Sequence, residues 1–458
     1  PKGHSLVVNL PTGSGKSLLF QLPVLKNGLQ SGLSLVVVPT ISLAIDQARR
    51  MHDLFIKNKI DCNHPLAWYS ELEETQKSLI KTNIRNGQQG ILFSSPEAVG
   101  GALLPSLFTA ASKGFLNYLC IDEAHLLIDW GDTFRTEYQA LTAVRNGLLH
   151  SCKEKQFRTV LFSATFTKES IRLIDILFGP PKNVHLVSGV FLRPEPIYYK
   201  NFASNKIEQR EKIVELLKYV PRPVIIYTTL KIDAELIYKD LKSEPFSNIQ
   251  IFHSGTTNKD EIITKWSNDK LDIVVATSAF GVGVDKSNVR TIIHATVPET
   301  LDRFYQEVGR SGRDGKSSNS ILIYTKDDLV TAKEIAEDIR ARTAGFENAF
   351  KRWKKMLINS NAINFNDEKF LSINLTSPGP GLSQVTDANT HHNLMTLIII
   401  ARAGLIKIYK NKPEYENSDY DNNIDIEEFW NKFYGTILIK FNDDKLNNFD
   451  YFKETYNK

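Results

Sequence analysis

The stretch Leu10-Pro11-Thr12-Gly13-Ser14-Gly15-Lys16-Ser17 decides the fold, because it joins an apolar run at residues 5–9 to a helix-like segment that begins at Leu18. A glycine-rich turn between a buried strand and a helix aims several backbone N–H groups at one spot, where phosphate binds. Lys16 is then expected to reach the β- and γ-phosphates of a nucleotide, and the Ser17 hydroxyl to hold Mg²⁺. Leu10 stands where the strict pattern has glycine, and an incidental glycine-rich turn is the alternative. The nucleotide contacts predicted here are Thr12, Gly13, Ser14, Gly15, Lys16 and Ser17.

The composition is that of a globular protein with two or three domains: 458 residues, 42% hydrophobic, 24% charged, with a net charge of +4. A charge this mild means that nucleic acid would be bound by local patches. The cysteines Cys62, Cys120 and Cys152 fit neither a disulfide framework nor a zinc site, so a reducing, cytoplasmic setting is expected. The apolar run at residues 394–403 is too short to cross a membrane. No signal peptide is visible, and we expect the true N-terminus to lie upstream of Pro1.

Short β-branched runs alternate with helix-like segments along most of the chain. Between residues 5 and 188 these runs are 33–38, 90–94, 118–121 and 159–162, and several are apolar on both faces, as in parallel strands covered by helices. After an extended linker at residues 189–199, a second series follows at 223–227, 249–252, 272–276, 291–293 and 320–324, without a phosphate loop. The pattern predicts an α/β fold of two doubly wound lobes, with one nucleotide held between them.

The predicted domains are therefore a nucleotide-binding lobe at residues 1–188, a second lobe at 189–340 and a C-terminal accessory domain at 341–458. In the last of these, residues 393–403 are helix-like, Gly404 is a plausible C-cap, and residues 405–409 are strand-like. We expect this domain to be mostly helical and to contain a winged helix.

An acidic pair and an arginine pair carry the predicted chemistry. Asp122-Glu123 ends a predicted strand, so Asp122 is expected to hold Mg²⁺ and Glu123 to orient the attacking water. A solvated pair of carboxylates is the alternative. In the segment 306–315, Arg310 and Arg313 stand three apart among glycines and could stabilise the γ-phosphate in the transition state. A basic surface turn is the alternative there.

The run Trp130-Gly131-Asp132-Thr133-Phe134-Arg135 follows the acidic pair. Aromatic rings and arginine in a loop can stack on bases and pair with phosphate. Trp130 and Phe134 are also four residues apart, and a buried helical face is an equally good interpretation of that spacing.

Taken in order, these motifs resemble those of the superfamily 2 helicases, and among them the RecQ-like DNA helicases, over about residues 1–340. The phosphate loop is similar to the first motif of the family, Leu10 included. The other similar segments, in chain order, are residues 38–43 (motif Ia), 95–97 (Ib), the DEAH box at 122–125, the aromatic-rich loop at 130–138, Ser163-Ala164-Thr165 (III), 276–285 (V) and 306–315 (VI).

The resemblance implies two tandem RecA-like lobes that use ATP and Mg²⁺ to move on single-stranded or forked DNA, in the 3′→5′ direction. It implies catalytic roles for Lys16, Asp122, Glu123, Gln306, Arg310 and Arg313, and nucleotide contacts by Gly283 and Asp285 as well. It implies that His125, Ser163 and Thr165 couple hydrolysis to movement. The DNA contacts that it implies are Pro39, Thr40, Ser95, Pro96, Trp130, Phe134, Arg135, His253 and Thr277.

The departures from the family also matter. The adenine-binding motif upstream of the phosphate loop is absent from this sequence, and Asp132 stands where the RecQ loop usually has histidine. Because no cysteine follows Cys152, the four-cysteine zinc domain of RecQ proteins is not expected, nor is zinc. Arg352-Trp353 and residues 402–406 resemble RecQ-like helicases of bacterial DNA-modification and phage-defence islands, which implies partner subunits of a DNA-processing or defence system.

The residues leave three alternatives to a RecQ-like DNA helicase open. An RNA helicase of the same superfamily is disfavoured, because DEAD-box RNA enzymes end motif II in Asp and open motif VI with His-Arg, whereas this chain has His125 and Gln306. A double-strand translocase that never unwinds is the second. A DNA-binding subunit that ATP merely switches is the third, and it has little use for a water-activating Glu123.

Overall fold

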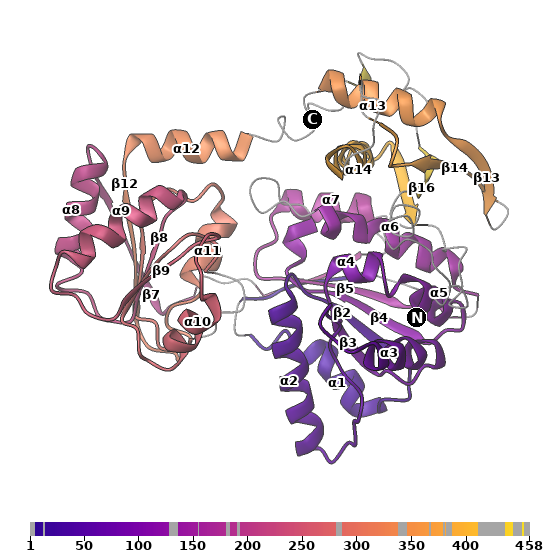
Figure 1. The fold of residues 1–458 in the computed structure, drawn as a ribbon, viewed down its shortest axis with the longest axis horizontal. Helices are drawn as coiled ribbons and strands as arrows, with labels where there is room; N and C mark the ends of the chain where they lie inside the picture. Colours follow the sequence, from indigo (N-terminus) through magenta and orange to yellow (C-terminus); the bar gives the residue numbers. More distant parts are fainter. Residues whose placement is uncertain are drawn as a thin grey trace. The chain divides into compact units, whose positions relative to one another are not determined.

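A computed structural model describes residues 5–11, 14–127, 136–153, 155–179, 184–189, 193–280, 286–337, 346–365, 368–378, 381, 387–410, 436–442 and 451–452 (Figure 1). The chain forms two compact units, each described here by itself. Unit 1 comprises Pro1–Asn9, Gly15–Ser188 and Asp338–Lys458, and unit 2 comprises Leu10–Ser14 and Gly189–Glu337. Among the described residues, every helix is too short or too polar to cross a lipid bilayer.

Unit 1 contains the predicted parallel sheet of the first lobe. Its six strands run in the order β3-β2-β4-β5-β1-β6, and every neighbouring pair is parallel. All residues of β2 are buried, which explains why this strand appears in the sequence as an unbroken apolar run. The strands are β1 (Ser5–Asn9), β2 (Leu33–Val37), β3 (Ile91–Ser94), β4 (Leu116–Ile121), β5 (Arg158–Ser163) and β6 (Val184–Ser188).

Helices follow the strands of this sheet, and two of them begin at side-chain caps right after a strand. The Thr40 and Ser95 side chains accept hydrogen bonds from Leu43 N (3.3 Å) and Ala98 N (3.4 Å) at the starts of α2 and α4. The helices are α1 (Leu18–Asn27), α2 (Ile41–Lys57), α3 (Glu74–Asn86), α4 (Pro96–Gly100), α5 (Leu104–Ser112), the short 3₁₀ helix η1 (Ala124–Leu127), α6 (Thr136–Ser151) and α7 (Lys168–Phe178).

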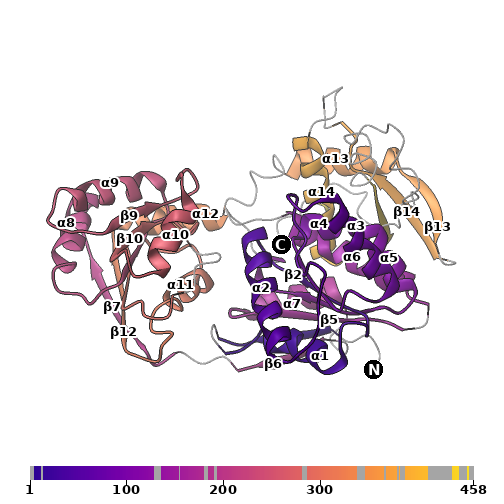
Figure 2. The same ribbon diagram turned by 60° about the horizontal axis from the view of Figure 1, so that its bottom comes forward.

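Unit 2 contains a second parallel sheet, of order β7-β12-β11-β8-β10-β9 (Figure 2). Its strands are β7 (Pro196–Phe202), β8 (Val224–Tyr227), β9 (Ile249–Phe252), β10 (Ile273–Ala276), β11 (Thr291–His294) and β12 (Ser318–Tyr324). Its helices are α8 (Lys206–Leu216), α9 (Lys231–Lys242), α10 (Lys259–Ser267), α11 (Leu301–Val308) and α12 (Lys326–Glu337). Residues 196–199, expected to be a linker, belong instead to the edge strand β7, whose first residue is a proline that needs no ladder partner there.

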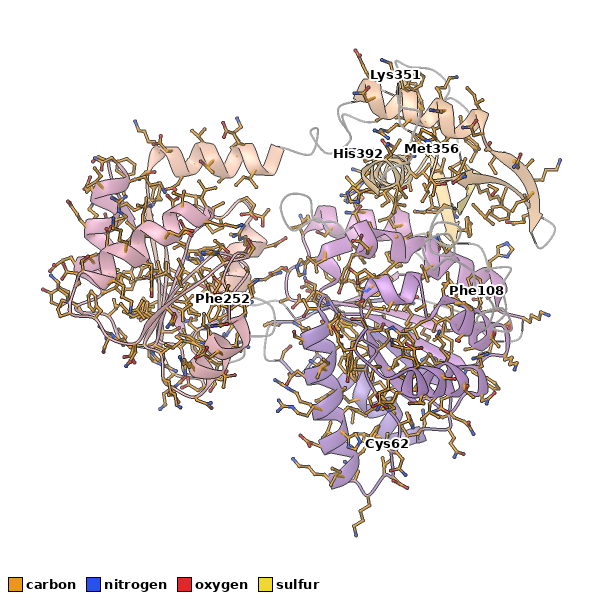
Figure 3. All side chains as sticks on the ribbon, viewed as in Figure 1. Cys62, Phe108, Phe252, Lys351, Met356 and His392 are labelled. Carbon is orange, nitrogen blue, oxygen red and sulfur yellow. The ribbon has the colours of Figure 1, made fainter. Side chains whose placement is uncertain are left out.

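The two sheets confirm the predicted fold of tandem doubly wound lobes. The predicted C-terminal helix, glycine cap and strand are also present: α14 (Asp387–Arg402), Gly404 with φ of 75°, and β15 (Ile406–Lys410). The strand is part of an antiparallel sheet of order β13-β14-β16-β15, with β13 (Asn361–Phe365), β14 (Glu368–Asn374) and β16 (Thr436–Phe441). Helix α13 (Phe346–Ile358) exposes Lys351 and buries Met356, which lie on opposite sides of it in Figure 3.

The C-terminal sheet packs on the first lobe within unit 1, through its edge strand β15 and helix α6. The Asn146 side-chain amide donates to the Ile408 carbonyl at 3.0 Å. A Cβ on Gly147 would lie 2.1 Å from the Lys410 carbonyl oxygen, so the helix and strand backbones touch. One hydrophobic core runs from Val7 of β1 to Phe452 at the end of the described chain. Helix α6 therefore covers an edge strand that would otherwise present unpaired carbonyls.

Candidate nucleotide and nucleic-acid site

The phosphate loop has the local geometry that its sequence predicts, as far as it is described; Thr12 and Gly13 lie outside the described residues. The Ser14 amide and the Ser14 hydroxyl both donate hydrogen bonds to the Pro11 carbonyl, at 3.3 Å and 2.7 Å. Gly15 has a φ of +80°, in the region that favours glycine. The Leu18 amide donates to the Gly15 carbonyl at 3.0 Å, and the Ser17 side chain makes no capping bond to α1. The Ser17 hydroxyl at this helix start is thus not engaged in capping.

The acidic pair stands at the carboxyl end of β4, as predicted. Asp122 is half-buried. Desolvation and the neighbouring Glu123 raise its pKa to about 7, against the opposing effects of Lys16 and the Glu123 amide, which donates to it at 2.9 Å. Glu123 itself has a φ of 48°. A left-handed backbone costs a non-glycine residue about 1–2 kcal/mol and concentrates at functional sites.

The oxygen donors here fit Mg²⁺ that is shared with nucleotide phosphates. Among the described residues no group of three or more His, Cys, Asp or Glu could hold a metal alone. Mg²⁺ in nucleotide sites needs no such cage, because one or two carboxylates and the phosphate oxygens suffice. Asp122, with the Ser17 hydroxyl, supplies a donor set of this kind.

A hydrogen-bonded cluster joins the acidic pair to the segment at the end of β5. The His125 ring nitrogen Nδ1 lies 3.1 Å from the Ser163 hydroxyl and 3.3 Å from the Glu123 carboxylate. The Ser163 hydroxyl accepts from the Thr165 amide at 3.0 Å and lies 3.5 Å from its hydroxyl. His125, Ser163 and Thr165 are all buried. The three residues predicted to act in coupling thus form one connected chain that ends on Glu123.

In unit 2 the predicted arginine segment, residues 306–315, begins in the last turn of α11. The Arg303 guanidinium contacts the Glu299 carboxylate (2.5 Å) and the Glu307 carboxylate (3.1 Å). Glu307 also pairs with His294 at 3.0 Å. Burial acts to raise the pKa of Glu307, but His294 and Arg303 outweigh it, and the pKa lies below its usual value. The Arg303 guanidinium is therefore held between two carboxylates of unit 2, next to the predicted arginine segment.

The segment itself holds the catalytic residues predicted for unit 2. Gln306, Arg310 and Arg313 are all partly exposed. The Arg313 Nε donates to the Gly309 carbonyl at 3.1 Å. Both arginines also exert an electrostatic influence on the buried Tyr227, whose pKa is raised by desolvation above all. The predicted Gly283 and Asp285 lie outside the described residues.

Two residues that the sequence analysis missed belong to these sites. Arg193 is buried and bonds to the Gly309, Ser311 and Gly312 carbonyls. The Tyr138 hydroxyl, completely buried, donates to the Asp122 carbonyl at 3.1 Å. Both act on backbone carbonyls, which every residue type has, so no residue pattern identifies the partner. The one indication in the sequence was for Tyr138, which stands at the end of the aromatic-rich segment.

The structure places the described DNA-contact candidates at the carboxyl edges of the two sheets. In unit 1 they follow β2 and β3. Pro39 and Pro96, which were predicted as members of DNA-gripping loops, are buried. The Thr40 and Ser95 hydroxyls stay partly accessible but already cap helices. The candidates Trp130, Phe134 and Arg135 lie outside the described residues.

In unit 2 the candidates follow the neighbouring strands β9 and β10. His253 is partly exposed, its amide donates to the Thr256 hydroxyl at 2.8 Å, and its Nδ1 accepts from the Gly255 amide at 3.1 Å. Thr277 is 7% exposed, and its amide donates to the Phe252 carbonyl at 3.1 Å. Phe252 is the last residue of β9, in unit 2 (Figure 3). A direct contact by Thr277 therefore has little side-chain surface available.

Comparison with known proteins gives the family. Residues 1–174 match the DEAD/DEAH box helicase family and residues 208–315 the helicase conserved C-terminal domain. The probable ATP-dependent DNA helicase RecS of Bacillus subtilis is 30% identical over 369 residues, which cover 78% of this chain and 70% of that protein. The ATP-dependent DNA helicase RecQ of Haemophilus influenzae is 31% identical over 337 residues, 73% of this chain and 50% of that protein. The chain thus spans about half the length of that relative.

Solved structures show the same fold. The DUF1998 helicase MrfA bound to DNA and AMPPNP has a TM-score of 0.58 and 22% identity, covering 73% of this chain and 48% of that one. The DEAD-box helicase Mss116 bound to ssRNA and UDP-BeF has a TM-score of 0.56 and 20% identity, covering 74% of this chain and 70% of that one. With both helicase domains matched and this identity to RecS, the chain belongs to the RecQ-like ATP-dependent DNA helicases of superfamily 2.

Proposed function

We propose that this chain is a motor that uses ATP hydrolysis to move 3′→5′ along single-stranded DNA and to unwind forked duplexes. The observation that carries the proposal is the connected chain from Glu123 through His125 and Ser163 to Thr165. It gives the water-activating carboxylate a direct mechanical link to the next strand of the sheet. A protein that only bound ATP would have no need of such a link.

In this proposal the phosphate loop, from Thr12 to Ser17, binds the nucleotide, and Lys16 contacts its terminal phosphates. Ser17 and Asp122 hold Mg²⁺, which when bound offsets phosphate charge. Glu123 orients the attacking water. Gly283 and Asp285 complete the nucleotide contacts.

The residues of unit 2 supply the rest of the proposed catalytic set. Gln306, Arg310 and Arg313 reach the γ-phosphate when the two units close around ATP. Arginine remains charged and binds phosphate oxygens with two N–H groups, so it suits the charge that develops in the transition state.

The protein moves along DNA if each cycle of closing and opening of the two units makes them hold and release the strand in turn. The proposed contacts are the loops at Thr40, Ser95, His253 and Thr277, with Trp130, Phe134 and Arg135 stacking on bases. Contacts of this kind are mostly with the backbone and are indifferent to sequence. RecS and RecQ, the relatives described above, are named as DNA helicases, which favours DNA over RNA as the track. A partner subunit from a DNA-processing or defence system remains part of the proposal.

The first experiment compares Lys16→Ala and Glu123→Gln with the wild type in ATP hydrolysis stimulated by single-stranded DNA. Both variants are expected to lose at least about 100-fold in kcat, the scale of a lost transition-state contact. Lys113→Ala and Glu71→Gln change the same residue types at exposed positions and should behave as wild type. Retained turnover in either active-site variant would contradict the ATPase assignment.

The second experiment measures strand displacement on forked DNA with a single 3′ or 5′ tail. Displacement with the 3′ tail alone supports the proposal. DNA-stimulated ATPase without displacement would indicate a double-strand translocase, and stronger stimulation by RNA would indicate an RNA helicase. ATP-dependent DNA affinity without turnover would indicate a switched binding subunit.

A further inference from the structure

Arg193, which precedes β7, occupies the centre of the turn formed by residues 309–312. Its side chain is only 8% exposed. Nη1 donates to the Gly309 and Ser311 carbonyls, at 3.0 Å each, and Nη2 donates to the Gly312 carbonyl at 2.7 Å. Nε donates to the Glu195 carboxylate at 3.2 Å. The guanidinium therefore has carbonyl oxygens on one side and a counter-charge on the other.

Arginine suits this place for a geometric reason. Its guanidinium is planar and presents five N–H donors at fixed angles, so several carbonyls can converge on it only in one arrangement. A lysine ammonium carries the same charge but has three donors on one atom, and it cannot serve the three carbonyls and Glu195 together. Buried carbonyls left without a donor are costly, so the turn is expected to rearrange without this fork.

Backbone hydrogen bonds and close packing hold the same turn in place as well. The Gly312 amide donates to the Val289 carbonyl at 3.0 Å, and a Cβ on Gly312 would lie 2.9 Å from the Cβ of Glu195. The Ser318 amide donates to the Glu195 carbonyl at 2.8 Å. Arg193 and Glu195 thus form one side of a close-packed frame around the turn.

This frame bears on the two arginines that the turn carries. Arg310 lies between the first two residues whose carbonyls Arg193 binds, and Arg313 directly follows the third. The Gly309 carbonyl accepts from both Arg193 and the Arg313 Nε, at 3.0 and 3.1 Å. A shift of that carbonyl would therefore move the Arg313 side chain directly.

We propose that Arg193 is a positioning residue that holds the turn so that Arg310 and Arg313 present their guanidinium groups to the γ-phosphate. The inference rests on the proposed function, since it takes those two arginines to act on that phosphate. It adds a residue from outside the arginine segment, 117 positions before Arg310 by the numbering.

The test uses the full chain with Arg193→Lys, which keeps the charge and removes the fork. Because arginine fingers act in the transition state, kcat for ATP hydrolysis is expected to fall about 10- to 100-fold while KM for ATP stays within about threefold. Arg145→Lys is the matched control: Arg145 is also buried, but its guanidinium Nε donates to the Thr159 hydroxyl in unit 1. Its kcat per folded molecule should remain that of the wild type.

A mutant-cycle comparison separates positioning from mere folding. In a background that carries both Arg310→Ala and Arg313→Ala, Arg193→Lys should lower kcat no more than about twofold further, because both groups that it positions are gone. A full additional loss would overturn the proposal. So would wild-type kcat in Arg193→Lys, or a lower melting temperature with unchanged activity per folded molecule.

A binding measurement gives a readout that needs no turnover. Arg193→Lys should bind Mg²⁺-ADP as the wild type does, and should bind Mg²⁺-ADP with aluminium fluoride more weakly by the same factor as its kcat loss. Equal affinity for that phosphate mimic would overturn the proposal. If the wild type hydrolyses ATP but displaces no strand, the helicase proposal fails while this inference is still decided by these measurements.

Discussion

Asp122 shows most directly what a functional residue costs the fold. Desolvation and Glu123 raise its pKa from an ordinary 3.8 to about 7. Between about pH 4 and 7 the folded chain therefore holds a proton that the unfolded chain has lost, so stability without nucleotide falls as pH rises through this window. Above pH 7 the folded protein carries a poorly solvated carboxylate.

Asp122→Asn should remove this cost. At pH 8, without nucleotide or Mg²⁺, we expect the variant to be more stable than the wild type by on the order of 2 kcal/mol. At pH 5 the gain should be less than half as large, because the folded carboxyl is then protonated and only the ionisation of the unfolded chain still disfavours the wild-type fold. Thermal unfolding at the two pH values measures this. An equal gain at both would show that shape rather than charge is responsible.

Two glycines in the arginine segment separate backbone strain from crowding. Gly312 and Gly315 have φ of +59° and +78°, so alanine at either is expected to cost about 1–2 kcal/mol. At Gly312 a Cβ would also lie 2.8 Å from the Lys316 carbonyl oxygen, whereas at Gly315 it would have nothing within 4 Å. Gly312→Ala should therefore unfold at a clearly lower denaturant concentration than Gly315→Ala. Equal midpoints would contradict the close packing.

At the scale of elements, the strands that the sequence predicts correctly are the buried ones. In β2, β8 and β10 every residue is buried, so each appears as an unbroken apolar run. Within the two parallel sheets the strands that were missed are β6 and β7, which are edge strands with largely exposed residues and carry no such pattern. In the C-terminal sheet, β13, β14 and β16 were not predicted either. The hydrophobic pattern of a sequence therefore indicates which residues are buried. It identifies a strand only where that strand is buried.

The site follows the same logic. Asp122 and Ser163 were found because each ends a buried strand, where the chain must turn polar. Arg193 and Tyr138 could not be found as partners, because each bonds to carbonyls, which a sequence does not distinguish. Arg193 also lies 116 residues or more from its partners. Only the folded chain brings them together.

Helix α6 links two sites, since Tyr138 near its start bonds to Asp122 while Asn146 and Gly147 contact β15. Gly147→Ala should detach that strand at a cost of about 2 kcal/mol or more, because the new Cβ would overlap the Lys410 carbonyl. Gly100→Ala is the matched helical change: its Cβ would meet only Val144, at 4.0 Å. Hydrogen exchange of the β15 amides should rise in the first variant and not in the second.

At the scale of the whole molecule, the accessory region is part of the core of the first lobe. Leu148 of α6, Trp353 of α13 and Ile406 of β15 belong to the same hydrophobic cluster. A chain that ends at residue 340 should therefore expose apolar surface and aggregate, whereas residues 193–337 should fold alone. Sedimentation and far-UV circular dichroism of the two fragments check this. A monomeric, folded 1–340 fragment would contradict the shared core.

The discontinuity of unit 1 also sets the order in which a ribosome can complete this protein. Unit 2 has all its residues once Glu337 is made, but the core of unit 1 closes only with Phe452. At about 5–20 residues per second, the first lobe waits on the order of tens of seconds with its apolar side chains uncovered. The second lobe is thus expected to fold before the first, and the nascent N-terminal segment is the part most in need of a chaperone.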